Sequence, residues 1–451
     1  MLDQWITASL LPSLRVRCIE LVRGVRAEGG VIIPKIIFQF SETPTGRLVF
    51  PSTDLANPHN DMAAPQRQQV WNFSAGPAVM PRPVLERAAA ELVDWNNTGM
   101  SVMELSHRSP EFEGILANAE KKLRTLMDIP PNYKVLWTQG GASSQFSALV
   151  YNLFGGTVES SERVADYYVT GAWSEKAVEE AQRLNVRVNI INDQSSSESH
   201  ASTHTFTSAE RKAMFTPAER CAYVYYCDNE TVHGVEFPSV LEDVPEGVPL
   251  VCDMSSNILS RSVDVKRFGV IFGGAQKNIG PAGVTLVIIR EDLLDRKHPL
   301  LVCPTMMDYK LCAKNNSMYN TPPTYAIYIS GLVFEWMLSL GGIKAMEERN
   351  AKKSALLYAA IDNSNGVFKC PVVKTFRSRM NVPFRVYGID GKPSADLEKK
   401  FLAGAEQRRM LQLKGHRSVG GIRASLYNAM PPEGVQALVD YMTEFAKTVD
   451  K

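Results

Sequence analysis

The sequence is short of the features that mark several large classes of protein. Its 451 residues include only 7 cysteines, which are scattered, with no CxxC pair and no run of histidine partners. This spacing indicates neither a zinc site nor a disulfide framework, so we predict no metal site and a reducing compartment. The formal net charge is only +1, which argues against a nucleic-acid or membrane-surface role. No apolar run is long enough to span a bilayer.

What the sequence does have is enough apolar residues, 45% hydrophobic, to build two domains around a sizeable core. Residues 1–61 differ from the rest, with arginines among apolar residues followed by a stretch containing Ser, Thr and Pro. Three explanations stay open for this extension: an organellar transit peptide, a disordered tail, or upstream sequence that is absent from the mature protein. We expect the folded protein to start near Met62 and to work in the cytoplasm, with organelle targeting through residues 1–61 as the alternative.

The chemistry is predicted around residues 250–283. The apolar run Leu250–Cys252 predicts a buried strand that ends on Asp253, and a second apolar run, residues 270–272, leads through small residues to Lys277. Ligands of open α/β sheets bind outside the carboxyl ends of the strands, where this acid and lysine would meet. A lysine there can form a Schiff base with a carbonyl cofactor, and an acid can keep a heteroaromatic nitrogen protonated, as pyridoxal phosphate requires. By spacing alone, an Asp and a Lys in such positions are more often a turn-capping acid and a solvated lysine.

The exact amino-acid sequence of this stretch is more informative about function than the spacing of Asp253 and Lys277. The segments VCDMSSN, from Val251, and GAQKNIGPAGVT, from Gly274, resemble the cofactor-lysine region of the phosphoserine aminotransferases. These are class V aminotransferases of the pyridoxal phosphate fold type I group. NFSAGP, at residues 72–77, resembles the start of the same family, and the likeness continues to about Phe445.

The resemblance implies an α/β fold of the type I pyridoxal-phosphate transferases. We expect a large cofactor domain with a mostly parallel mixed sheet over residues 62–342, and a smaller α+β domain over residues 343–451. The segment 62–83 is expected to pack on the small domain. Hydrophobic periodicity also predicts a helix over Val84–Asn96 and a strand over Phe368–Val373, whereas the Ser-, Thr- and His-rich residues 192–217 predict a surface loop without a metal site.

A small-residue turn follows the predicted strand Lys134–Thr138 and opens a helix, which is an arrangement that binds anions. In the family, the backbone at the positions of Ala142 and Ser143 receives the cofactor phosphate, and Ser144 adds a hydroxyl. This chain has ASS where other members carry a glycine-rich variant or an arginine. Which of the three groups donates therefore stays open.

The TGAW motif ends another predicted strand and brings Trp173 toward the same crevice, with Ser174 expected to cap the next helix. A tryptophan is by itself more often a core residue. The resemblance instead implies that the indole stacks on the cofactor ring. It also implies a hydrogen bond from Thr231 to the phenolic oxygen of the cofactor, and it includes Gln276 among the cofactor-binding residues.

Two further groups are implied to bind across a dimer. Asn320 and Thr321, in the motif NTPPT, match residues that hold the partner's cofactor phosphate, which implies an obligate homodimer with shared active sites. His107 and Arg108, in ELSHRSP, match a pair that holds the substrate phosphate from the neighbouring subunit. Arginine suits this task because its planar fork pairs two phosphate oxygens at once.

The segment KGHRSVGGIRASLYN, from Lys414, holds the remaining candidate residues. An arginine inside the apolar strand pattern IRASLY needs a charged partner, since an unpaired buried guanidinium is costly. The resemblance implies that Arg423 binds the substrate α-carboxylate, while His416 and Arg417 bind the substrate phosphate. The alternative is an internal salt-bridge cluster.

Together these residues predict a transaminase that exchanges an amino group between L-glutamate and 3-phosphohydroxypyruvate, giving 2-oxoglutarate and O-phospho-L-serine in serine biosynthesis. Lys277, Asp253 and Trp173 are the expected catalytic residues. The nearer alternatives are sister enzymes of the same fold, namely serine–glyoxylate or alanine–glyoxylate aminotransferases and cysteine desulfurases. The paired His-Arg motifs argue against the first two, because their substrates carry no phosphate. A catalytically silent scaffold is the more distant alternative.

Overall fold

The computed structural model describes residues 14–16, 40–42, 69–155, 163–191, 208–295 and 302–449. The chain divides into two units, Met1–Gln68 and Gln69–Lys451. In the first unit, strands β1 (Leu14–Val16) and β2 (Phe40–Glu42) pair antiparallel. All the other elements belong to the second unit. The expected start of the fold near Met62 lies outside the described residues.

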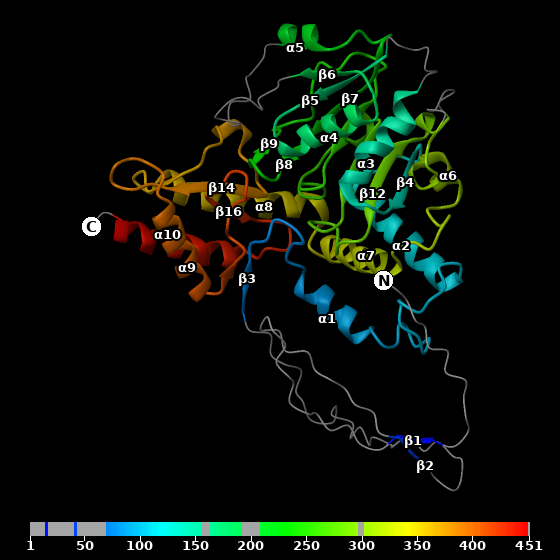
Figure 1. The fold of residues 1–451 in the computed structure, drawn as a ribbon, viewed down its shortest axis with the longest axis horizontal. Helices are drawn as coiled ribbons and strands as arrows, with labels where there is room; N and C mark the ends of the chain where they lie inside the picture. The colour runs from blue at the N-terminus through cyan, green and yellow to red at the C-terminus, as the bar shows by residue number, and fades with distance from the viewer. Residues whose placement is uncertain are drawn as a thin grey trace. The chain divides into compact units, whose positions relative to one another are not determined.

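A seven-stranded sheet forms the centre of the second unit (Figure 1). Its strand order is β4-β12-β11-β10-β7-β5-β6, and every pair is parallel except where β12 runs antiparallel to β11 and β4. The mixed, mostly parallel sheet confirms the predicted α/β class. The strands are β4 (Tyr133–Thr138), β5 (Val164–Tyr168), β6 (Val188–Ile191), β7 (Cys221–Cys227), β10 (Leu250–Asp253), β11 (Val270–Gly274) and β12 (Thr285–Arg290).

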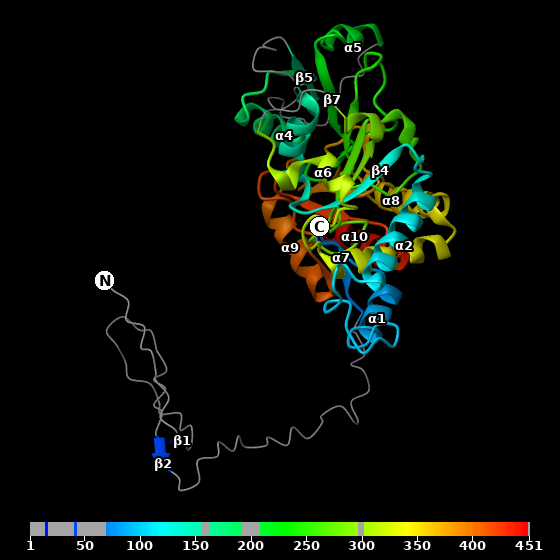
Figure 2. The same cartoon turned by 90° about the vertical axis from the view of Figure 1, so that its right-hand side faces the viewer.

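Helices cover both faces of this sheet, which explains why its inner strands read as continuous apolar runs. Alternate residues of β7 show the division: Tyr226 packs in one core with helices α2 (Pro110–Met127) and α7 (Thr324–Ser339). Tyr225 packs in a second core with helices α3 (Gly141–Leu149) and α4 (Ala172–Arg183). Helices α2 and α7 lie side by side in both views (Figure 1 and Figure 2).

A second, three-stranded sheet has the order β13-β14-β16 and builds its own core. Helices α8, α9 and α10 contribute to that core, and so does Phe73, which follows β3 near the start of the unit. Strand β3 pairs in parallel with β15. The bounds are β3 (Trp71–Asn72), β13 (Phe368–Lys369), β14 (Asn381–Val386), β15 (Met410–Leu411), β16 (Ile422–Ser425), α8 (Gly342–Asp362), α9 (Ala395–Gln407) and α10 (Pro432–Val449). The domain boundary at residues 342 and 343 stays a prediction.

The remaining elements are short and connect these layers. They are α1 (Arg82–Ala90), a π-helical turn (Val150–Phe154), α5 (Ser208–Met214), the hairpin strands β8 (Asn229–Glu230) and β9 (Val235–Glu236), α6 (Tyr309–Lys314), and, among the described residues, four 3₁₀ turns at Val265–Arg267, Glu291–Leu293, Thr305–Met307 and Lys374–Phe376.

The four 3₁₀ turns are each 3 residues long, and the π-helical turn has 5 residues. They terminate or extend the neighbouring strands and helices without forming layers of their own.

Three local predictions were wrong. The helix predicted over Val84–Asn96 ends at Ala90, because Asn96 and Asn97 adopt left-handed backbone angles and Asp94 bonds the backbone of Gly99 in a turn. The strand predicted over Phe368–Val373 stops at Lys369, since the Pro371 that follows has no N–H for the ladder. Part of the predicted surface loop 192–217 is helix α5, and residues 192–207 lie outside the described part.

Within the described ranges, no single helix is long and apolar enough to cross a membrane. Helices α7 and α8 together meet that criterion by length and composition, and they are bent by 81° at their junction.

Candidate active site

Three strands of the central sheet bring polar side chains to one edge. Strand β10 ends on Asp253, strand β11 runs into the turn that carries Lys277, and the β8–β9 hairpin after strand β7 carries Thr231. Because β7, β10 and β11 pair in parallel, their carboxyl ends lie at the same edge. The Nζ of Lys277 donates a hydrogen bond of 2.8 Å to the Oγ1 of Thr231.

The NFSAGP segment packs against the turn that carries the lysine. The backbone N–H of Ala78 donates to the carbonyl of Gln276 at 2.8 Å. Gly76 has a φ of +137°, and a Cβ there would lie 3.5 Å from both Cγ and Cε of Lys277. Glycine therefore suits this position, because its backbone conformation is one that other residues rarely adopt.

Lys277 is held in a form suited to nucleophilic chemistry. Burial lowers the pKa of its amine to about 8, although the negative charge of Asp253 acts in the opposite direction. Within the described ranges, no carboxylate lies at ion-pair distance from Nζ, and its hydrogen-bond partner is the Thr231 hydroxyl. A substantial neutral fraction of the amine near neutral pH follows, and the neutral amine is the nucleophile.

Asp253 is a buried acid, 3% exposed. Its Oδ1 accepts a hydrogen bond of 2.8 Å from the backbone N–H of Ser255. Burial raises the pKa of Asp253, whereas the hydrogen bonds from Ser255 and the charge of Lys277 act to lower it. An acid of this kind favours a cationic partner, such as a protonated ring nitrogen.

Trp173 presents an aromatic surface beside the lysine. The Nζ of Lys277 lies 5.8 Å from the centroid of the indole, and the Nζ of Lys176 lies 4.6 Å from it. The indole Nε1 is buried and has no hydrogen-bond partner among the described residues. A flat ligand that packs on the indole would therefore have the amine of Lys277 close to the edge of the ligand.

The start of helix α4 differs from the prediction. Ser174 is not the N-cap, which is Gly171. The Ser174 hydroxyl lies inside the first turn, where it accepts hydrogen bonds from the backbone N–H groups of Thr170 and Gly171. A Cβ at Gly171 would lie 2.6 Å from the Nδ1 of His233, so the close approach of these two segments requires glycine.

Glu230 is a residue of the site that the sequence analysis missed. Its carboxylate accepts hydrogen bonds from the backbone N–H groups of Trp173 and Ser174 and from the Ser174 hydroxyl. The available signal was an acid in the segment DNETVHG, directly before Thr231 and after a fully apolar strand. An acid in that position is expected to be buried, and a buried acid needs donors.

The turn predicted to bind an anion lies at the N-terminus of helix α3. Gly140 is the N-cap, with a φ of 94°, and no side chain in the described part of the chain caps the helix. A Cβ at Gly140 would lie 1.9 Å from the Oγ of Ser144, so the turn can close only around glycine. The N–H groups of the first helical turn, which includes Ala142 and Ser143, are therefore available to an anion such as a phosphate.

The cationic residues of the last motif lie beside the same lysine. Arg423, on β16, donates from Nη1 to the carbonyl of Thr231 at 3.1 Å, and burial lowers the pKa of its guanidinium. Burial also lowers the pKa of His416, and the charges of Arg423, Arg417 and Lys176 act in the same direction. Arg417 is exposed. Four positively charged or chargeable groups thus gather near Trp173, which suits an anionic substrate.

Two predicted pairs are not joined to this group. His107 is buried with no hydrogen-bond partner for Nε2 among the described residues, and Arg108 is exposed. Asn320 and Thr321 are exposed as well. No hydrogen bond or ion pair within the described ranges links either pair to Lys277 or Arg423.

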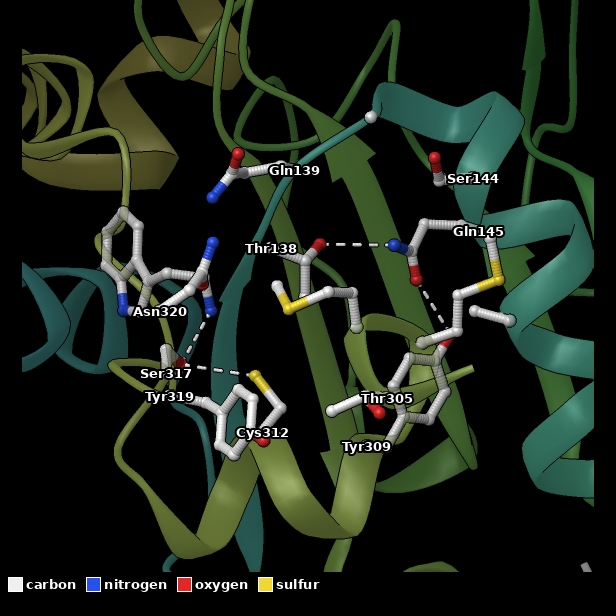
Figure 3. Close-up of a pocket in the computed structure, with 15 residues that line it drawn as sticks. Thr138, Gln139, Ser144, Gln145, Thr305, Tyr309, Cys312, Ser317, Tyr319 and Asn320 are labelled. Atoms are coloured by element: carbon white, nitrogen blue, oxygen red, sulfur yellow. Dashed lines mark hydrogen bonds between the residues drawn. The ribbon is translucent and has the colours of Figure 1, made fainter. Parts of the chain in front are cut away.

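Asn320 instead lines a cavity of about 290 Å³ that extends to the turn at Gly140 and Ser144 (Figure 3). Gln145 lines this cavity and joins two other lining residues, accepting a hydrogen bond from Tyr309 at 2.7 Å and donating one to Thr138 at 3.1 Å. The Nε2 of Gln139 donates to the carbonyl of Thr321 at 3.5 Å. The segment with Asn320 and Thr321 therefore lies near the turn predicted to bind an anion, beside a cavity whose lining does not include Lys277.

This fold and this set of residues define a class of protein. The sequence model of the family "Aminotransferase class-V" matches residues 70–438. The chain therefore belongs to the class V aminotransferase family.

The particular relatives are phosphoserine aminotransferases. The chain is 52% identical over 379 residues to the phosphoserine aminotransferase of Laribacter hongkongensis, covering 84% of this chain and 99% of the relative. Among solved structures, the phosphoserine aminotransferase of Bacillus circulans subsp. alkalophilus matches with a TM-score of 0.75, 41% identity, and 84% and 99% coverage. The pyridoxal-phosphate-bound enzyme of Trichomonas vaginalis matches with a TM-score of 0.74, 44% identity, and 83% and 99% coverage.

The lowered pKa of Lys277 gives a prediction for the cofactor-free protein. The rate at which an amine reagent modifies Lys277, followed by mass spectrometry of its peptide, should rise with a midpoint near pH 8. In Asp253→Asn the midpoint should move lower still, because the negative charge that raises the pKa is removed. A midpoint at the ordinary lysine value of about 10.4 would contradict this account of the site.

Proposed function

We propose that the protein is a phosphoserine transaminase that uses pyridoxal 5′-phosphate. It moves an amino group reversibly between L-glutamate and 3-phosphohydroxypyruvate, giving 2-oxoglutarate and O-phospho-L-serine for L-serine biosynthesis. One observation carries the proposal: the weakly basic amine of Lys277 lies between Thr231 and the indole of Trp173, with Arg423 bonded to the same threonine. The amine, an aromatic ring and a cation that can bind a carboxylate therefore lie together in one site.

The residues of the site fit the proposed cofactor. When bound, pyridoxal phosphate supplies a carbonyl carbon that takes up the amino group and a ring that accepts electrons. The chain holds it through the amine of Lys277, the indole of Trp173, the hydroxyl of Thr231 and the carboxylate of Asp253. Its phosphate would be held by the backbone of Ala142 and Ser143, by the hydroxyl of Ser144 and by the partner subunit's segment Asn320–Thr321. Gln276 would contribute beside the lysine.

Lys277 has a second task, which is to move the proton of the substrate. An amine with a pKa near 8 can take a proton from the substrate Cα and return it to another carbon, since both of its protonation states are populated at neutral pH. Asp253 supplies the negative charge that keeps the ring nitrogen protonated. Trp173 keeps the ring in one plane.

The cationic cluster selects the substrate. Arg423 binds the α-carboxylate, and its hydrogen bond to the Thr231 carbonyl holds the guanidinium in place. His416 and Arg417 bind the substrate phosphate, joined by His107 and Arg108 of the neighbouring subunit. A substrate with no second anionic group, such as pyruvate or glyoxylate, would leave this cluster of like charges unneutralised.

The visible absorbance spectrum of the purified protein tests the function. A yellow band that bleaches with L-glutamate and returns with 3-phosphohydroxypyruvate, but not with pyruvate or glyoxylate, is the expected result. Return of the band with glyoxylate would retain the fold and overturn the substrate. Absence of a band after addition of pyridoxal phosphate would overturn the proposal that the protein is a pyridoxal-phosphate enzyme.

The phosphate assignment predicts an uneven loss in Arg417→Ala. The KM for 3-phosphohydroxypyruvate should rise about 10-fold to 100-fold, because a charge-assisted hydrogen bond contributes ~1.5–3 kcal/mol. The KM for L-glutamate should change far less. Arg408→Ala, which removes an arginine paired with Glu444 on the surface, is the matched control. Equal losses for both substrates in steady-state kinetics would argue against the assignment.

We propose further that the enzyme is a homodimer with shared active sites. The support is that no hydrogen bond or ion pair among the described residues links His107, Arg108, Asn320 or Thr321 to Lys277, combined with their assigned roles at the site. Closed two-fold dimers are the most common soluble assembly, and in them each subunit can complete the site of the other.

Sharing of residues predicts complementation between two inactive variants. Lys277→Ala and Arg108→Ala should each be weakly active alone at low concentrations of 3-phosphohydroxypyruvate. After the subunits are mixed and exchanged, about a quarter of the wild-type activity should appear, because half of the dimers are then mixed and each has one intact site. If Arg108 acted within its own chain, mixing would restore nothing.

The proposed compartment is the cytoplasm, with an organelle reached through residues 1–61 as the alternative. Imaging of the full chain beside a chain that starts at Met62 distinguishes them. Identical diffuse distributions support the cytoplasm, and a difference supports targeting.

A further inference from the structure

We propose that Glu230 is a positioning residue that holds the Trp173 ring in place relative to Lys277, an inference that rests on the proposed function. In this proposal, Glu230 fixes the orientation of the indole on which the cofactor ring would stack. Glu230 itself has no contact with the reacting atoms.

The carboxylate of Glu230 holds the first turn of helix α4 through both of its oxygens. Its Oε2 accepts from the backbone N–H of Trp173 at 3.0 Å, and its Oε1 accepts from the backbone N–H of Ser174 at 2.9 Å. The Ser174 hydroxyl donates to the same Oε1 at 2.6 Å. The two oxygens thus fix two successive peptide groups, and these set the direction in which the Trp173 side chain leaves the helix.

The other end of the connection is the residue after Glu230. The hydroxyl of Thr231 accepts from the Nζ of Lys277, and its carbonyl accepts from the Nη1 of Arg423. Two consecutive residues of the β8–β9 hairpin, Glu230 and Thr231, therefore contact the backbone of Trp173, the amine of Lys277 and the guanidinium of Arg423. A shift of the hairpin would displace all three, whereas loss of the Glu230 bonds would free only the peptide groups of Trp173 and Ser174.

The charge of Glu230 is compensated by the helix rather than by a cation. Glu230 is 0% exposed, and no Lys or Arg among the described residues forms an ion pair with it. The N-terminus of α4 supplies two N–H groups and the positive end of the helix dipole. Burial raises the pKa of Glu230 to about 6, and the hydrogen bonds from Ser174 and Trp173 act to lower it. The carboxylate is therefore ionised at pH 8.

Glu230→Gln tests the role with little change of shape. The amide retains one accepting oxygen but replaces the other with an NH₂ group, which has no lone pair for an N–H of the helix. We expect the dissociation constant for pyridoxal phosphate, from absorbance titration at pH 8, to rise about 10-fold or more, as when an outer support of a bound group is removed. We also expect the visible circular dichroism of the bound cofactor to weaken, because its ring is no longer held in one orientation.

Glu180→Gln is the matched control on the same helix. Glu180 accepts a hydrogen bond of 2.6 Å from the Ser147 hydroxyl, away from Trp173. The dissociation constant of Glu180→Gln for pyridoxal phosphate should stay within about 2-fold of the wild-type value, as for a change outside the site. An equal rise in Glu180→Gln would overturn the proposal, since a general weakening of α4 would then explain both results. The proposal would also be overturned if the dissociation constant of Glu230→Gln stayed within about 2-fold of the wild-type value and the circular dichroism of the bound cofactor were unchanged.

Two further results keep the test decisive. If Glu230→Gln does not fold, by far-ultraviolet circular dichroism, Glu230→Asp takes its place, because it retains the charge and draws the carboxylate back by one methylene. A raised dissociation constant in Glu230→Asp supports the proposal, and an unchanged one overturns it. Failure of the wild type to bind pyridoxal phosphate would overturn the proposed function itself, and this inference with it.

Discussion

The in-register parallel pairing of β7, β10 and β11 is the constraint on which the site depends. Cys227 pairs with Asp253, and Asp253 pairs with Phe272, so β7 and β10 end level at one edge of the sheet and β11 continues past them to Gly274. A slip of one residue in either pair would turn Asp253 to the opposite face. Packing on both faces prevents that slip, because it would move each side chain from the core that it fills into the opposite one.

Two buried lysines show how their surroundings decide their roles. Burial lowers the pKa of both Lys277 and Lys353. The Nζ of Lys353 donates to three backbone carbonyls, those of Leu426, Tyr427 and Met430, which uses all of its hydrogens. Lys277 bonds the hydroxyl of Thr231 and lies beside an aromatic ring. The first lysine is thus committed to structure, and the second is available for chemistry.

Buried charges elsewhere near the site are paired, which limits their reactivity. Arg261 donates to both oxygens of Asp228, and Arg379 pairs with Glu236 on β9. Loss of one partner of such a pair costs about 3–5 kcal/mol, because the remaining charge stays buried. Glu230 differs, since its counterpart is the N-terminus of α4. That arrangement links the hairpin to the aromatic surface, which a pair of side chains would not do.

The sequence by itself determined the α/β class, the strands that carry Asp253 and Lys277, and the family, because apolar runs and long motifs are local properties of the chain. It misplaced the end of the helix at Ala90 and the cap of α4, where turn-forming asparagines and Glu230 outweigh periodicity. Only the tertiary structure decided which side chains meet. Glu230 acts on Trp173 across 57 residues, and no local pattern records a hydrogen bond between such distant positions.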